Sequence, residues 1–161
     1  LVAIFFYLII MFKRWQFSLS TIIALAHDVV FVLGVFSLLK GVMPFNMEID
    51  QAFIAAILTV IGYSMNDSII ILDRIRENLT VEKKHKLYDI INISTSETLS
   101  RTINTSLSTF LIVLIIFAFG GESIKGFMFA KLIGIVIGTF SSIFVASPLL
   151  YDFTKKGQMN K

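Results

Sequence analysis

Long apolar runs alternate with short polar connections along this chain. Four of the runs have the length of a membrane-crossing helix, and they cover residues 18–39, 51–72, 99–119 and 128–151; a shorter run covers residues 1–12. A helix needs about 20 apolar residues to cross the hydrocarbon core of a bilayer. The pattern therefore predicts an all-α membrane protein, a polytopic helix bundle with four complete spans and one partial span.

The first run is too short to cross a bilayer alone. Lys13 and Arg14 follow it, whereas a signal peptide carries its positive charges before the apolar stretch. We therefore interpret residues 1–12 as part of a longer membrane helix, and the sequence as a fragment of a longer protein.

The connection 73–98 is the longest. Its apolar residues only loosely follow a helical stripe between basic and hydroxyl residues, so we expect either a helix lying on the membrane surface over part of it or a solvated loop. In the connection 40–50, Gly41 and Pro44 are expected to interrupt the helix, and Pro148 should kink or end the last one.

Composition agrees with this pattern and narrows the function. Hydrophobic residues make up 56% of the chain and the mean hydropathy is +0.84, which excludes an ordinary soluble domain. There is no cysteine, so disulfides and thiolate metal sites are excluded. The net charge of +3 does not indicate nucleic-acid binding, because the basic residues lie mainly in short connections between the spans.

The basic residues predict an orientation. Connections 40–50 and 120–127 hold only Lys40 and Lys125, whereas most of the remaining lysines and arginines lie in 13–17, 73–98 and the tail 152–161. Connections rich in lysine and arginine stay in the cytoplasm. We therefore expect loops 13–17 and 73–98 and the tail 152–161 to be cytoplasmic.

An acidic side chain interrupts the span 51–72. Asp67 follows Asn66 there, and on a helical wheel it shares a face with Tyr63 and Ser64. An ionisable group at the centre of a membrane helix costs roughly 2.5–3.5 kcal/mol on insertion scales, so it normally has a partner or a task. We expect Asp67 to be the functional centre; the alternative is a carboxylate near the interface that reaches water.

A second acid, Asp28, follows His27 in the span 18–39. Two interpretations stay open: a group that handles protons, or a packing element satisfied by His27 and neighbouring hydroxyls. A metal site is not expected, because no further histidine or cysteine lies within the spans.

The span 99–119 carries a polar ridge at helical spacing, made of Thr98, Arg101, Asn104, Thr105 and Ser108. Arginine supplies a permanent positive charge. Beside Asp67 it would favour the ionised carboxylate, and moving it away would let the carboxylate take a proton. The alternative is a boundary arginine that pairs with lipid phosphate.

The last span contains a stripe of small residues. Gly134 and Gly138 are four residues apart, and Ser141, Ser142 and Ala146 continue the stripe. Small residues on one face let a neighbouring membrane helix approach closely.

Four sequence blocks resemble the SecF half of the SecDF protein-export membrane proteins. They are ALAHDVVFVLGVFSLL, FIAAILTVIGYSMNDSIIILDRIREN, ETLSRTINTSLSTF and GGESIKGFMFAKLIGIVIGTFSSIFVASPLLY. The resemblance implies a member of the resistance-nodulation-division superfamily, with five of the six helices of one SecF-type half, the first of them partial. It also implies an accessory subunit of the Sec translocase that uses the proton gradient to assist export of polypeptides.

The resemblance further implies residue roles and partners. Asp67 in the ND motif and Arg101 in the LSRT motif match proton-path positions, and Asp28 matches the HD motif. Protons are the coupling ion, with no other cofactor. The implied partners are a SecD half or subunit, the SecYEG translocon, YajC- and YidC-type proteins, the translocating polypeptide and membrane lipid, and the implied location is a bacterial or archaeal cytoplasmic membrane.

Three other functions are compatible with the pattern. One is proton-coupled efflux of small molecules, and another is a passive translocon scaffold whose polar residues only pack helices. The third is an intramembrane aspartyl protease using Asp28 and Asp67, since such enzymes need paired carboxylates. Its expected Gly-x-Gly-Asp pattern is absent, because Ser64-Met65-Asn66-Asp67 stands in that place, so we do not expect an enzyme.

Overall fold

A computed structural model describes residues 1–45, 47–81 and 86–159, with side chains as far as Lys155, and its regular structure in this part of the chain is entirely helical. The helices are α1 (Val2–Phe12), α2 (Trp15–Leu39), α3 (Gln51–Val81), α4 (Leu87–Phe119), α5 (Glu122–Ser141) and α6 (Ser147–Met159), and a π-helical segment, η1 (Ser142–Ala146), joins α5 to α6. Three helices and the continuous α5–η1–α6 segment are long and apolar enough to cross a membrane, and α1 is shorter. The predicted all-α membrane bundle is confirmed.

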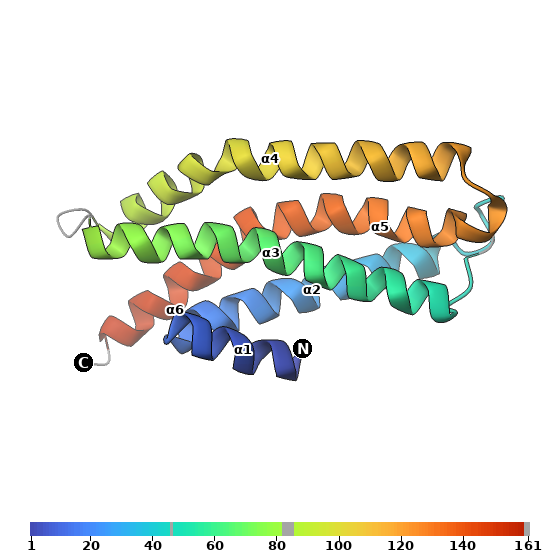
Figure 1. The fold of residues 1–161 in the computed structure, drawn as a ribbon. Helices are drawn as coiled ribbons and strands as arrows, with labels where there is room; N and C mark the ends of the chain where they lie inside the picture. The colour runs from blue at the N-terminus through green and yellow to red at the C-terminus, as the bar shows by residue number, and fades with distance from the viewer. Residues whose placement is uncertain (46, 82–85, 160–161) are drawn as a thin grey trace.

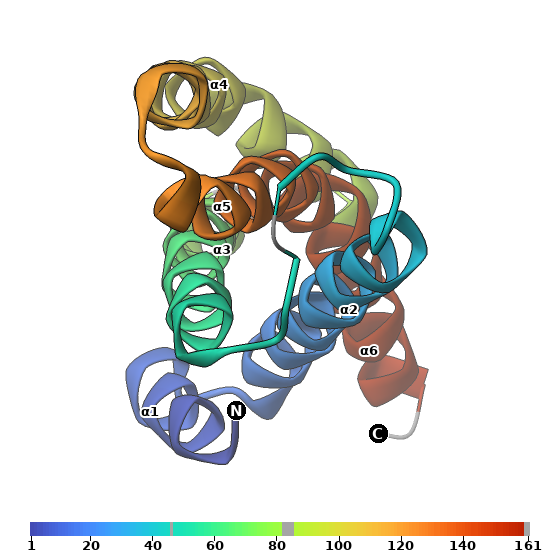
Figure 2. The ribbon, with the colours of Figure 1, turned by 90° about the vertical axis from the view of Figure 1, so that its right-hand side faces the viewer.

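The long helices run side by side in alternating directions (Figure 1). We call the end where α1 leads into α2 the basic end; α3 finishes, α4 starts and α6 finishes there as well. Seen from the opposite end, α5 lies among α2, α3 and α4 and packs against all three (Figure 2). A polar side chain on α5 can therefore reach three other helices.

Three predicted spans continue as helix well beyond their apolar residues, and the last of them, predicted as 128–151, runs from Glu122 to Met159 as α5–η1–α6. The described parts of the connection 73–98, residues 73–81 and 86–98, form neither a separate surface helix nor a solvated loop, so this prediction is wrong. They extend α3 to Val81 and start α4 at Leu87. Polar side chains join these extensions, because Asn78 of α3 donates a hydrogen bond to Ser94 of α4 over 2.9 Å. The length of an apolar run predicts the part of a helix that suits lipid, but it does not predict polar turns that continue the same helix.

The other ends follow ordinary rules for starting and stopping helices. Asp50 caps α3 through its side-chain oxygen, which accepts a hydrogen bond from the backbone N–H of Phe53 over 2.9 Å. After α2 ends at Leu39, Gly41 adopts a φ of +87°, a left-handed conformation that favours glycine. The predicted interruption after α2 is therefore present.

Pro148 bends the last span without ending it. Proline lacks the N–H that would bond to the carbonyl four residues earlier, and η1 lies directly before this position. The hydroxyl of Ser147 donates a hydrogen bond to the carbonyl of Ser142 over 3.2 Å, so this carbonyl of the π-helical segment has a partner. Figure 1 shows α6 diverging from the line of α5, so the predicted kink is present.

Apolar clusters at the two ends of the bundle are separated by a polar layer. The cluster at the basic end includes Leu8, Phe12, Phe17, Ile71, Leu72, Ile75, Ile91 and Leu150. The cluster at the opposite end includes Val32, Phe36, Met47, Phe53, Ala56, Val60 and Ala130. Along α3, Ser64 and Asp67 fall between the two sets, and both are buried. The bundle thus places its buried acids at mid-height.

Candidate functional site

Asp28 is completely buried and fully hydrogen-bonded. Its Oδ2 accepts a hydrogen bond from Ser64 on α3 and another from Ser141 on α5, the latter over 2.8 Å. Nδ1 of His27 lies 3.1 Å from Oδ1. Partners from α2, α3 and α5 therefore meet at this carboxylate, which is the arrangement expected of a packing element.

Asp67 is also buried, with 1% of its surface exposed, but only half of its carboxylate is bonded. Ser106 of α4 donates a hydrogen bond to Oδ2 over 3.3 Å. The buried Oδ1 has no hydrogen-bond partner among the described residues. The structure therefore does not show the alternative in which this group reaches water at the interface.

The two carboxylates have different hydrogen-bonded surroundings. Oδ2 of Asp28 accepts from two hydroxyls, and its Oδ1 faces the His27 ring. Oδ1 of Asp67 has no hydrogen-bond partner among the described residues. Among the described residues, no hydrogen bond joins Asp28 to Asp67, and each has its own hydroxyl partners.

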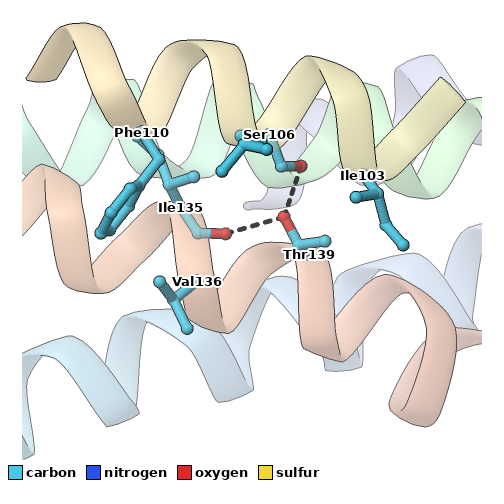
Figure 3. Close-up of a pocket in the computed structure, with 7 residues that line it drawn as sticks. Ile103, Ser106, Phe110, Ile135, Val136 and Thr139 are labelled. Atoms are coloured by element: carbon cyan, nitrogen blue, oxygen red, sulfur yellow. Dashed lines mark hydrogen bonds between the residues drawn. The ribbon is translucent and has the colours of Figure 1, made fainter. Parts of the chain in front are cut away.

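A hydroxyl pair connects Asp67 to α5. The hydroxyl of Thr139 lies 2.7 Å from that of Ser106 and 2.8 Å from the carbonyl of Ile135, and with its single proton it donates to one of them at a time. Figure 3 shows Ser106 and Thr139 facing each other across the gap between α4 and α5. They lie in a groove of about 280 Å³ whose walls are otherwise apolar, including Phe110 and Val136. One residue pair thus links α3, α4 and α5.

Close contact between α3 and α5 brings these groups together. A Cβ atom added to Gly134 would lie 2.1 Å from Cγ2 of Val60, and one added to Gly138 would lie 2.9 Å from Cβ of Ser64. Side chains larger than glycine would push the helices apart at both positions. The glycines therefore allow α3 and α5 to approach so closely that Ser64 of α3 and Ser141 of α5 can both bond to Asp28.

The buried face of α4 carries hydroxyl groups that the sequence analysis missed as a set. Its members are Ser94, Thr98, Thr102 and Ser106, spaced four residues apart, and all are buried. Their four-residue spacing would have predicted this face, but the prediction was based on the charged Arg101, which lies on another face of α4. The hydroxyl of Thr102 has no hydrogen-bond partner among the described residues.

The predicted pairing of Asp67 with Arg101 is not formed. Arg101 is exposed on the outer face of α4, and no ion pair within 4 Å joins it to Asp67 in the described part of the chain. Asn104 and Thr105 share that exposed face, and Thr105 donates to the carbonyl of Arg101. The predicted ridge is therefore only partly correct, because Arg101, Asn104, Thr105 and Ser108 are exposed together, whereas Thr98 is buried.

Asn66 is likewise exposed, although it stands beside the buried Asp67. No hydrogen bond joins it to either carboxylate among the residues described. Of the polar residues predicted to support the acids, Ser64 and His27 therefore do so here, whereas Asn66, Asn104 and Thr105 do not.

An ionic network fastens α3 to α4 at the basic end. Arg74 binds Glu97 of α4 and Glu77 of its own helix, each over 2.7 Å. Asn78 adds a hydrogen bond to the same oxygen of Glu97 over 2.9 Å. Two turns separate Arg74 from Asp67, so this network helps set which side of α3 faces Ser106.

Comparison with known proteins places this geometry in a family. The family described as "Protein export membrane protein SecD/SecF, C-terminal" matches residues 1–156. "Protein translocase subunit SecF" of Rhodothermus marinus is 53% identical over 152 residues, covering 94% of this chain and 49% of that protein. The protein of the same name from Haemophilus influenzae is 50% identical over 139 residues, covering 86% of this chain and 41% of that one.

A solved structure has the same fold. "Crystal structure of SecDF in Super-membrane-facing form" superposes with a TM-score of 0.86 at 39% identity, over 97% of this chain and 20% of that one. The chain spans about half or less of the length of these relatives. With the family match over nearly all of its residues, the chain belongs to the SecD/SecF family of protein-export membrane proteins.

Proposed function

We propose that this chain forms the transmembrane part of a SecF-type subunit that assists polypeptide export, and that protonation of Asp67 couples the subunit to the proton gradient. The observation that carries the proposal is the half-bonded state of Asp67, which is buried between α3 and α4 with Oδ1 lacking a partner among the described residues. Keeping an ionisable group inside a membrane helix costs free energy, so its presence there indicates a function.

The energy of one proton is sufficient for a conformational switch. Moving a proton across the membrane yields about 2.3 kcal/mol per 100 mV. Two packings of a helix bundle can differ by only a few kcal/mol, so gaining or losing a charge at Asp67 could shift the balance between them. The contact between Ser106 and Thr139 would pass such a change from α3 to α4 and α5.

The remaining roles rest on the family. We infer that a SecD half or subunit covers part of the exposed surface, and that Arg101 acts from that surface in a proton path. A SecYEG translocon, YajC- and YidC-type proteins and the translocating polypeptide are the further proposed partners. The basic end is proposed to be cytoplasmic, in a bacterial or archaeal membrane.

The test replaces Asp67 with asparagine in the complete subunit, assembled with its partners in membrane vesicles. Asp67→Asn keeps the shape and cannot ionise, so we expect normal assembly but loss of gradient-dependent export and proton flow. Asp73→Asn is the matched control, because Asp73 lies on the same helix but is exposed and paired with Arg76. Undiminished export and proton flow in Asp67→Asn would overturn the proposal.

A second candidate, a passive scaffold, is favoured by one observation. Asp28 has neighbours from three helices, two of them hydroxyl donors, as a purely structural acid would have. If Asp67 were structural as well, Asp67→Asn would reduce assembly and export together. Loss of gradient dependence with assembly intact therefore separates the coupled subunit from the scaffold.

A further inference from the structure

A second groove lies at the basic end, away from both carboxylates. It has a volume of about 290 Å³ and is formed by the first turns of α4 together with η1 and α6. Its lining includes Tyr88, Asn92 and Thr95 from α4, and Phe144, Ser147 and Tyr151 from the bent last span. The bend before Pro148 carries α6 past the start of α4, so the groove follows from the kink.

The lining changes in character along the groove. Its end toward the middle of the bundle includes the exposed Phe144, and its end toward the tail of α6 carries two tyrosines, Tyr88 and Tyr151, whose rings meet edge to face at 6.2 Å. Just beyond them, the Nζ atom of Lys155 lies 5.7 Å from the ring centre of Tyr151, and Lys86 stands two residues before Tyr88. Phospholipids have the same order, from acyl chain through interface to charged phosphate.

The two lysines beside the groove have no acidic partner in the described part of the chain. Neither Lys86 nor Lys155 forms an ion pair with any described side chain. A ligand with an apolar chain and a negative charge beyond it would fill the groove and pair with them.

We propose that this groove binds one anionic phospholipid from the leaflet at the basic end. Its acyl chain lies along Phe144, and its phosphate lies between Lys86 and Lys155. The order of apolar, aromatic and cationic groups fits a lipid better than a helix of another protein. An apolar membrane helix would have no negative charge to pair with the two lysines at the basic end.

The test measures lipid binding to the complete, delipidated subunit by native mass spectrometry, with dioleoyl phosphatidylglycerol and dioleoyl phosphatidylcholine as probes. We expect the wild type to prefer the anionic lipid. Lys86→Gln/Lys155→Gln should weaken phosphatidylglycerol binding by about tenfold or more, since each basic residue near the surface contributes about fivefold. Lys13→Gln/Lys40→Gln removes the same charge outside the groove and should retain the preference.

Location is tested separately. Asn92 is exposed at the groove, so Asn92→Trp should fill it and reduce binding of both lipids. A photoreactive amino acid at position 92, in native membranes, should cross-link to phospholipid. Equal binding of the two lipids by the wild type, equal losses in the two double variants, or cross-linking of position 92 to a protein chain would each overturn the proposal.

Discussion

Ser141 of α5 donates a hydrogen bond to Asp28 of α2 over 2.8 Å, and both residues are completely buried. Two residues earlier on α5, Thr139 bonds to Ser106, which in turn donates to Asp67. One helix therefore contributes hydroxyls to the surroundings of both acids. The acids differ in how completely they are bonded, and the proposed proton-binding role of Asp67 depends on that difference.

Replacing the two acids by leucine should have unequal effects on stability. Asp28→Leu leaves Ser64 without its acceptor, while Ser141 keeps the carbonyl of Gly138, and a buried polar group left unsatisfied costs about 1–3 kcal/mol. Asp67→Leu removes one bond, and Ser106 keeps Thr139 as a partner. We expect a clearly larger loss for Asp28→Leu, measured as the free energy of unfolding of the purified protein in detergent.

The asparagine variant is the control for this comparison. In Asp28→Asn, the amide oxygen can still accept from both serines while its NH₂ group faces His27, so most of the stability should return. Equal destabilisation by Asp28→Leu and Asp67→Leu would show that the observed bonding difference has no energetic consequence.

Gly134→Ala should separate α3 from α5. The added methyl group would lie 2.1 Å from Val60, and overpacking of this kind costs about 1–3 kcal/mol. Thermal unfolding should show the loss, and Gly134→Ala/Val60→Ala should recover part of it. Gly62→Ala is the matched control, since nothing lies within 4 Å of the position its Cβ would take. A stable Gly134→Ala protein with no repair by Val60→Ala would contradict the close contact.

The Arg74–Glu97 pair should contribute modestly to holding α3 against α4. Both side chains are more than one-third exposed, so a double-mutant cycle of Arg74→Ala and Glu97→Ala should give a coupling of about 0.2–1 kcal/mol that decreases with added salt. The comparison pair is Arg76–Asp73, which lies within α3. Spin-label distances between α3 and α4 should widen only when the Arg74–Glu97 pair is removed, and equal widening with either pair would argue against a link between the helices.

The apolar pattern was sufficient to predict four spans because a bilayer imposes a minimum length on every crossing helix. It could not predict where α3 ends or where α4 begins, since both helices include polar turns outside the lipid-compatible stretch. Their extension depends on bonds between residues far apart in the sequence, such as Arg74 with Glu97 and Asn78 with Ser94.

The candidate site was predicted in its residues but only partly in its connections. The sequence alone determined that Asp28 and Asp67 lie within apolar spans, because the cost of burying a charge makes such positions conspicuous. Only the tertiary structure decided that Ser106 is the partner of Asp67 and that Arg101 points outward. Helical spacing predicts which residues share a face of α4. Which of these faces is buried and which is exposed depends on how α3 and α5 pack against it.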